Sequence, residues 1–418
     1  MTEDLPAGLH HGFRRPSRRR RWWRLLTPVS AATVLVFSMA GPVIAPMASA
    51  APSCVPAGSS HLTARLILHS GEKFAGSVVA ASGCDIGIYV QPGSTGVSIR
   101  NVTVSGALDQ GILVQDSSHV TIEDSTISGN LVRPDVCPFP PAQPKGPCIV
   151  DAKAVELLGT SDSAVIGNTI ANNLGEGGIG VFDDGTQSPG TLGQGLPRAA
   201  ENNRIVHNTV VNNPLGCGIV VSTHVAGEDV TGNEVLDNVV VGNAEGVVVA
   251  DNMPGTRISG TVVQGNVIAD SVAPGVVLNS LAPNDVVSGT LIQGNVVSGN
   301  GGLPPFEPLP GYISKPTGVI VVTAALPADA PLGMSAPVQE GLQLVGNTIT
   351  DESWGIWSTP QNQLTMNGNI FGAGVQQISG VVPPMTAAAV KALPGPGLQP
   401  WQVQWLESGG ASGLPETS

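Results

Sequence analysis

A four-residue pattern, whose commonest forms are Gly-Asn-x-Ile and Gly-Asn-x-Val, recurs along most of this chain of 418 residues. Such a repeat places one residue type in the same environment many times, which requires a fold of stacked units. The sequence therefore predicts a solenoid. Clear copies begin at Gly167, His207, Asp237, Gly265, Gly294, Gly346 and Gly368, and degenerate copies begin at Arg100 and Glu123.

The spacing of the repeat limits which solenoid it can form. From Asn347 to Asn369 the interval is 22 residues, and from Asn101 to Asp124 it is 23. Longer intervals in the middle of the chain contain insertions. A unit of about 22 residues is too short for a propeller blade or a helical pair.

Each repeat carries two strand signals. One alternates around the Asn, as in residues 165–170, and the other follows a glycine, as in Gly218-Ile219-Val220-Val221. Charged residues make up only 12% of the chain and 54 residues are glycine, which favours short strands and tight turns over helix. Alternating apolar side chains should form a core, with successive coils stacked in parallel about 4.8 Å apart.

The repeated Asn should lie at one turn of every coil, where it tolerates left-handed dihedrals and can hydrogen-bond along the stack. A second polar corner is predicted at Asn172, Asn212, Asn243 and Asn300. The fold class is therefore all-β.

Over roughly residues 85–380, these units resemble the right-handed parallel β-helix repeat proteins of the pectin-lyase-like superfamily. The resemblance implies a single-stranded right-handed parallel β-helix with an N-terminal cap and long loops on one face. It implies no single activity, because this fold occurs in polysaccharide lyases, glycoside hydrolases, epimerases and non-catalytic surface proteins.

The chain divides into four expected parts. Residues 1–50 read as a signal peptide, 51–85 as an N-terminal cap, 86–380 as the β-helix, and 381–418 as a C-terminal cap helix and tail. The leader combines an arginine-rich start, an apolar stretch and a small-residue cleavage motif. We therefore expect a secreted or cell-envelope protein, with a retained anchor and twin-arginine export as alternatives.

Cleavage of the leader would remove 7 of 18 basic and 2 of 31 acidic residues, which leaves 11 and 29 and a net charge of −18. Such a charge argues against nucleic acid or an anionic membrane surface as a partner.

All five cysteines follow the leader. An oxidising compartment favours two local disulfides, Cys54 with Cys84 and Cys137 with Cys148. Cys217 is left over, and we interpret it as a small buried core residue.

Polar residues that follow the Gly-Ile-x-Val strands are the candidate site. Most insertions begin at the same point of the coil, and insertions in solenoids often build one binding face. Counting from each glycine predicts that Asp183, Asp184, His224 and Asp251 cluster on three consecutive coils as catalytic residues. Carboxylates two coils apart would lie about 9–10 Å from one another, near the separation found in inverting glycosidases. Two further positions of this face, Asp116 and Asn252, are predicted to bind substrate.

Two other roles compete for the same acids. Asp and Asn at strand ends commonly stabilise turns, and Asp183-Asp184-Gly185 makes a good turn by itself. Asp183 and Asp184 could instead bind Ca²⁺ with a neighbouring carboxylate, and no other cofactor is expected.

Polygalacturonase-type hydrolases offer a comparison. Their Asp-Asp pair, Gly-His-Gly and Arg-Ile-Lys correspond in order to residues 183–184, 222–224 and 257–259. Both glycines around His224 are absent, and Ser259 replaces the Lys. Arg257 with the aromatic residues Trp354 and Trp357 completes the predicted substrate-binding set. So few cations argue against a polymer of uronic acids.

The sequence thus predicts a secreted, monomeric β-helix that binds or processes an extracellular polysaccharide or cell-surface glycan along a loop-walled groove. If it is an enzyme, a hydrolase or a lyase is expected. The alternative is a non-catalytic surface or envelope scaffold.

Overall fold

The computed structural model describes residues 53–57, 62–131, 153–175, 177–184, 198–225, 228–251, 253–301, 315–325 and 334–379. Several predictions lie outside these residues and are not addressed further by the structure. They concern the leader, the Cys137–Cys148 disulfide, Asn252 and the C-terminal cap helix.

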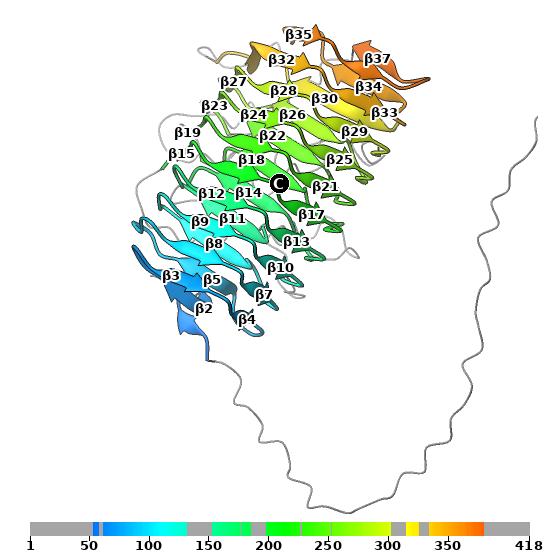
Figure 1. The fold of residues 1–418 in the computed structure, drawn as a ribbon. Helices are drawn as coiled ribbons and strands as arrows, with labels where there is room; N and C mark the ends of the chain where they lie inside the picture. The colour runs from blue at the N-terminus through cyan, green and yellow to red at the C-terminus, as the bar shows by residue number, and fades with distance from the viewer. Residues whose placement is uncertain are drawn as a thin grey trace, which may run out of the picture. The chain divides into compact units, whose positions relative to one another are not determined.

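The described residues form strands and turns, without any helix, and the strands belong to four sheets (Figure 1). The all-β prediction is confirmed. No helix in this part of the chain is long and apolar enough to cross a membrane.

Sheet A has 12 strands. They are β1 (Val55–Pro56), β2 (Thr63–Leu68), β5 (Ile86–Val90), β8 (Ile112–Gln115), β11 (Val155–Leu158), β14 (Ile179–Phe182), β18 (Ile219–Ser222), β22 (Val247–Asp251), β26 (Val276–Ser280), β30 (Thr317–Thr323), β34 (Trp354–Ser358) and β37 (Gln376–Ser379).

Sheet B has 10 strands. They are β3 (Lys73–Ala75), β6 (Ser98–Arg100), β9 (Thr121–Glu123), β12 (Ala164–Ile166), β16 (Arg204–Val206), β20 (Glu234–Leu236), β24 (Val262–Gln264), β28 (Leu291–Gln293), β32 (Leu342–Val345) and β35 (Leu364–Asn367).

Sheet C also has 10 strands, and sheet D has 5. Sheet C contains β4 (Val78–Ala80), β7 (Thr103–Ser105), β10 (Thr126–Ser128), β13 (Thr169–Ala171), β17 (Thr209–Val211), β21 (Val239–Val241), β25 (Val267–Ala269), β29 (Val296–Ser298), β33 (Thr348–Thr350) and β36 (Ile370–Phe371). Sheet D contains β15 (Ala200–Glu201), β19 (Asp229–Thr231), β23 (Arg257–Ser259), β27 (Val286–Ser288) and β31 (Val338–Glu340).

The chain visits the sheets in a fixed order on every coil. A short coil runs from sheet A to B to C, and a longer one inserts a strand of sheet D after sheet A. Each strand pairs in parallel with its counterpart one coil away, except that β1 adds to β2 antiparallel. The stretch predicted as the N-terminal cap contains β2, β3 and β4, which pair with the next coil like any others.

Branched apolar side chains fill the interior. Because strand side chains alternate, every second residue of a strand points inward, and the parallel register aligns these residues into columns. Burying each such side chain stabilises the fold by roughly 1.5–3 kcal/mol. One column in sheet A is Ile88, Ile112, Val155, Ile179 and Ile219.

The repeated Asn forms a buried ladder between sheets B and C, as predicted. Asn168 Nδ2 donates to Asn208 Oδ1 at 3.0 Å and to the Ile122 carbonyl at 2.9 Å, so one amide bonds to both neighbouring coils. The ladder satisfies polar groups that would be costly to bury alone. It continues through Asn238, Asn266, Asn295, Asn347 and Asn369.

The two degenerate copies are displaced by one residue from their predicted alignment. Asn101 and Asp124 have positive φ values of 52° and 50° and occupy the left-handed position that Gly167 takes later in the stack. The ladder position on those coils belongs to Val102 and Ser125, since Ser125 N donates to Asn168 Oδ1. The early coils therefore keep the left-handed turn but have Val102 or Ser125 where later coils have the ladder Asn.

The second polar corner is also displaced in part. Asn172 and Asn212 are exposed and have positive φ, and the ladder uses the next residues, Asn173 and Asn213. Asn243 and Asn300 lie in the ladder as predicted. In both Asn-Asn pairs, 172–173 and 212–213, the buried second Asn bonds along the stack.

The insertions do more than form loops. After five of the sheet A strands, a short part of the extra length builds a strand of sheet D, which belongs to the wall of the solenoid itself. The outward face of sheet A is buried rather than an open groove, and it is largely apolar, with polar exceptions such as Gln115 and Glu156. A second hydrophobic cluster there includes Leu113, Val220, Val248, Ile320 and Trp357.

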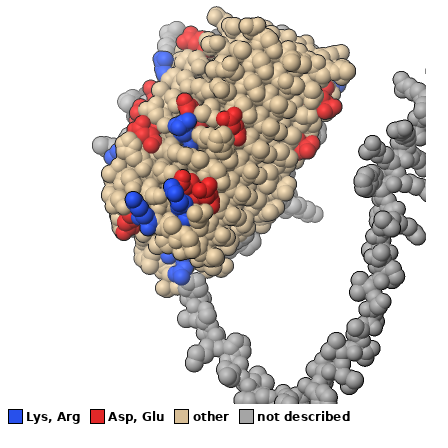
Figure 2. Space-filling model, in the orientation of Figure 1, with Lys and Arg blue, Asp and Glu red and all other residues tan. Residues whose placement is uncertain are grey.

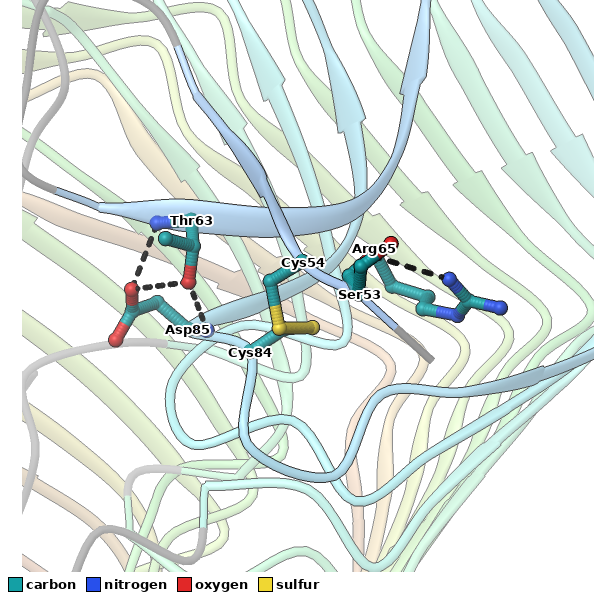
Figure 3. Close-up of a disulfide and its surroundings, with 6 residues drawn as sticks. All are labelled: Ser53, Cys54, Thr63, Arg65, Cys84 and Asp85. Atoms are coloured by element: carbon teal, nitrogen blue, oxygen red, sulfur yellow. Dashed lines mark hydrogen bonds between the residues drawn. A yellow bond between two sulfur atoms is a disulfide. The ribbon is translucent and has the colours of Figure 1, made fainter. Parts of the chain in front are cut away.

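The predicted Cys54–Cys84 disulfide is present at the N-terminal end of the stack (Figure 3). Beside it, the backbone and hydroxyl groups of Thr63 donate to Asp85 Oδ2 at 2.7 and 2.8 Å. The disulfide and these bonds attach β1 and β2 to the start of β5. Cys217 is buried, as predicted, and its Sγ lies 3.2 Å from Glu245 Oε2.

Candidate functional site

The predicted cluster of Asp183, Asp184, His224 and Asp251 divides into three separate environments. Asp183 is fully buried, and its two carboxyl oxygens accept the backbone N–H groups of His224 and of Val225, the latter at 3.2 Å. Burial raises the pKa of Asp183, and these hydrogen bonds oppose the rise. Asp183 therefore stabilises the turn of the next coil.

His224 packs its ring on Phe182 of the preceding coil, with the ring centroids 3.9 Å apart and the planes inclined by 16°. Desolvation lowers the pKa of His224 to about 3, and the charge of Lys153 adds to this effect. The imidazole is neutral at physiological pH and stacked on an aromatic ring.

Asp251 is fully buried and accepts hydrogen bonds from the hydroxyls of Thr223, at 2.9 Å, and of Thr256. Burial raises its pKa to about 7. Its environment is the interior of the solenoid, so no open surface connects it with a ligand as large as a polysaccharide.

Asp184 instead lies beside Asp116. In the register of sheet A these residues belong to coils two apart, and Gly159 occupies the coil between them. A Cβ at Gly159 would lie 2.6 Å from Asp116 Oδ1 and 2.9 Å from the Cβ of Asp184. The missing side chain therefore leaves the space in which the two carboxyls meet.

Arg198 joins this pair from the chain that returns after an insertion. The backbone groups of Asp184 and Arg198 exchange hydrogen bonds of 2.8 and 2.7 Å, and Arg198 Nε lies 3.9 Å from Asp116 Oδ1. The Arg198 side chain is 56% exposed while that of Asp116 is 6% exposed. The cation therefore screens the carboxyl pair only weakly.

Burial and the adjacent carboxyl govern the charge of the pair. The pKa of Asp116 is raised to about 7, first by desolvation and then by the charge of Asp184 and a hydrogen bond to it, while Arg198 lowers it. A second carboxyl so close opposes the ionisation of Asp116, because two adjacent carboxylates repel one another. The site can thus hold a proton near neutral pH.

A buried chain of side chains supports the pair from behind. The hydroxyl of Tyr89 donates to Gln115 Oε1 at 3.1 Å, and Gln115 Nε2 donates to Asp184 Oδ2 at 2.6 Å. Desolvation, followed by the charges of Asp116 and Asp184, raises the pKa of Tyr89, so the phenol remains a donor. The chain fixes the orientation of Asp184.

Asp116 lines a pocket of about 340 Å³ at the corner that follows sheet A, whereas Asp184 is buried outside its lining. This volume suits one or two sugar-sized groups. The floor is a row of short parallel bridges that runs through Ser118, Ser161 and Glu201. The pocket is lined by Gly93, Ser94, Asp116, Ser117, Ser118, Gly159, Ser161, Arg198, Ala199 and Glu201.

Three predicted substrate-binding residues lie elsewhere. Arg257 is exposed at the start of β23 in sheet D, outside the pocket lining. Trp357 is 2% exposed in the second hydrophobic cluster, so its ring offers no open face to a sugar. Trp354 is half-buried near the C-terminal end, with Lys315 Nζ 5.5 Å from its ring centroid. Of the predicted residues, Asp116 lines the pocket and Asp184 lies next to Asp116.

Sequence reasoning missed Gly159, Gln115 and Arg198. The coil that contains Gly159 begins with Ala154 instead of the usual glycine, so counting from glycines skipped it. Counting by strand register would have placed Gly159 between the two acids. Arg198 returns from a long insertion, and no periodicity could place it.

The described residues contain no group of three or more His, Cys, Asp or Glu side chains suited to a metal ion. The site of Asp116 and Asp184 is thus a carboxyl pair with one flanking arginine, able to hold or move a proton and to bond to hydroxyl groups.

Known proteins were compared with this chain by family and by structure. The family described as right handed beta helix region matches residues 67–263. A search of curated proteins gave no match.

Three solved structures are similar in fold. PfbA, a surface adhesin of Streptococcus pneumoniae, has 12% identity, a TM-score of 0.44, and coverage of 76% of this chain and 84% of its own. The polygalacturonase from Erwinia carotovora ssp. carotovora has 10% identity, a TM-score of 0.44, and coverage of 77% and 87%. A PL6 alginate lyase in complex with a trisaccharide has 12% identity, a TM-score of 0.39, and coverage of 76% and 81%.

The structural neighbours thus include polysaccharide-processing enzymes and an adhesin, and they carry no argument about the activity of this chain. The family match and the parallel order of the sheets agree with the resemblance seen in the repeat. The chain is a right-handed parallel β-helix repeat protein.

Proposed function

We propose that this protein binds an extracellular glycan in the pocket of Asp116 and Arg198. The observation that carries the proposal is the pocket lined by Asp116 and Arg198, with Asp184, Gln115 and Tyr89 forming a buried chain of polar groups next to Asp116. A preorganised set of buried polar groups that faces a pocket is the usual form of a site for a polar ligand.

The lining favours a ligand rich in hydroxyl groups and poor in charge. Ser94, Ser117 and Ser161 supply hydroxyls that can donate and accept, and the acids accept from sugar hydroxyls. Arg198 is opposed by Asp116 and Glu201, so the pocket has no surplus of positive charge for a chain of uronic acids. On the face drawn in Figure 2, basic groups lie beside acidic ones on a largely uncharged surface.

Binding fits the pair better than glycoside hydrolysis. The two carboxyls of retaining and inverting glycosidases stand about 5–5.5 Å and about 6.5–9.5 Å apart, with the sugar between them. Here a Cβ at Gly159 would lie 2.6 Å from Asp116 Oδ1 and 2.9 Å from the Cβ of Asp184, so the two side chains leave no room for a sugar ring between them. The proposed ligand lies in front of the pair.

A glycan array followed by calorimetric titration of the full chain tests the proposal. Asp116→Asn and Arg198→Gln should each weaken binding of any neutral oligosaccharide at least tenfold, by removing a charged hydrogen-bond partner. Arg204→Gln is the matched control, because Arg204 is exposed to the same degree but pairs with Glu234 on sheet B. Binding that is equally strong in all three variants would place the glycan site elsewhere.

A non-catalytic surface scaffold is the second candidate. It is favoured by the structural use of Asp183 and Asp251, whose hydrogen bonds serve the turns and the interior. An array without any bound glycan, together with an intact fold, would favour the scaffold. Either function requires export, and N-terminal sequencing of the protein in the culture medium tests whether residues 1–50 are removed.

A further inference from the structure

Two buried carboxyls outside the pocket, Asp251 and Asp285, lie next to one another on adjoining coils. Both side chains are 0% exposed. The Asp251 carbonyl accepts Leu281 N at 3.0 Å, and the following amide, Ala282 N, donates to Asp285 Oδ2 at 2.8 Å. The backbone of Asp251 and the carboxyl of Asp285 are therefore anchored to the same short turn.

Each carboxyl accepts hydrogen bonds at one of its oxygens. Asp251 Oδ1 accepts from the two threonine hydroxyls, and Asp285 Oδ2 accepts from Ala282. The backbone N–H of Val286 also lowers the pKa of Asp251, and those of Gly255 and Leu281 lower that of Asp285. Asp251 Oδ2 and Asp285 Oδ1 are buried without a hydrogen-bond donor among the described residues. A buried carboxylate oxygen without a donor or a cation is strongly unfavourable.

Two neutral side-chain oxygens on neighbouring strands are also buried without a hydrogen-bond partner among the described residues. Ser280 is the register partner of Asp251, so their side chains lie on the same side of sheet A, and Ser280 Oγ is buried without a partner in the described structure. Gln339 is the register partner of Val287, two residues after Asp285, and its Oε1 is likewise without a partner there.

The electrostatics of the pair lack a compensating cation. Asp251 raises the pKa of Asp285, and the neighbouring Asp229 raises that of Asp251. Desolvation is the largest cause for both acids, and no lysine, arginine or histidine contributes to either. The pair must therefore be protonated or hold a positive ion from solution.

We infer that Asp251 and Asp285, together with the Ser280 hydroxyl, form a buried binding site for a divalent hard cation of the Ca²⁺ class. The donors are all oxygens, as Ca²⁺ prefers, and two carboxylates match its charge. The site lies inside the solenoid, so the ion stabilises the coils that β22 and β26 begin.

The test measures metal content and thermal stability of the full chain. Protein refolded from denaturant in CaCl₂ should retain one calcium per chain after gel filtration, and its Tm should exceed that of protein refolded in EDTA by several degrees, because an ion that binds only the native state stabilises it. Asp285→Asn and Ser280→Ala should abolish or sharply reduce both the retained calcium and this Tm difference.

Asp183→Asn is the matched control, since Asp183 is equally buried but both of its oxygens accept backbone N–H groups. It should lose stability yet keep the calcium-dependent rise in Tm. Wild-type protein without retained calcium, and with the same Tm in CaCl₂ and EDTA, would overturn the inference and leave protonated carboxyls. Ser280→Ala keeps both carboxyls, so it decides the matter if Asp285→Asn fails to fold.

Discussion

The carboxyl of Asp116 bonds to the carboxyl of Asp184, although the two residues lie on coils two apart. Neighbouring coils are about 4.8 Å apart, so residues two coils apart can meet only where the intervening coil has no side chain between them. Gly159 provides the space, since any Cβ there would overlap both acids. The site therefore depends on an absent side chain as much as on the two present ones.

Gly159→Ala should separate the two carboxyls. Gly159 has a φ of 56°, which costs a residue with a side chain about 1–2 kcal/mol, and the overlap with Asp116 Oδ1 should add about 1–3 kcal/mol. Gly129→Ala is the control, because Gly129 has a φ of 65° with nothing within 4 Å of a built Cβ. Urea unfolding should show a larger loss for Gly159→Ala than for Gly129→Ala. Equal losses would mean that the pair tolerates a methyl group between its members.

Asp116 should make stability depend on pH. Its pKa in the folded protein is about 7 against an ordinary value of 3.8, so between these values the folded chain binds more protons than the unfolded chain. The contribution is complete below the ordinary value and is lost as the pH rises through about 7. Asp116→Asn removes it.

Unfolding at about pH 5 and about pH 8 should therefore show Asp116→Asn gaining on wild type at the higher pH, by up to ~2.7 kcal/mol, because about two pH units of the shift lie between pH 5 and the folded pKa of about 7. Buried acids remote from Asp116 occur in both proteins and cancel in this difference. A gap between the two proteins that is independent of pH would mean that Asp116 is ionised throughout this range.

The sequence predicts the solenoid well because its stabilising contacts repeat. Each Asn of the ladder bonds to the same atoms one coil away, so the pattern appears in the sequence as a period. The prediction was wrong by one residue where the period weakened, at Asn101 and Asp124, because a left-handed turn accepts Gly, Asn and Asp alike. Strand register, which a single degenerate copy cannot fix, decides between the two positions.

The site was predictable only in part, because its contacts occur once and leave no period in the sequence. Asp116 and Asp184 stood out as polar residues after strands, but their meeting depends on Gly159 and on the return of the chain at Arg198. Asp183 and Asp184, adjacent in sequence, have unrelated roles because successive residues near the end of a strand point in opposite directions. The sequence could not show which of the two meets Asp116.

The interior of the Asn ladder should contribute more stability than its end. Asn238→Ala leaves the Ile205 carbonyl and the backbone N–H of Asn208 buried without their partners, at a cost of about 1–3 kcal/mol for each group. Asn369 is half-buried on the last ladder coil, so Asn369→Ala should cost less. Chemical denaturation of both variants gives the comparison. A smaller loss at Asn238 than at Asn369 would contradict a cooperative ladder.

Removal of the Cys54–Cys84 disulfide should loosen the N-terminal end of the stack before the rest. The bond closes a loop with a sequence separation of 30, and a loop of that size is worth about 3–4 kcal/mol. Hydrogen exchange in the double variant Cys54→Ser, Cys84→Ala should accelerate in β1 and β2 and stay slow near β18, because each coil contacts mainly its neighbours. Cys217→Ser, which keeps a donor toward Glu245, is the control and should exchange like wild type at β1 and β2. Uniform acceleration along the whole stack would show that the solenoid unfolds as one cooperative unit rather than from its end.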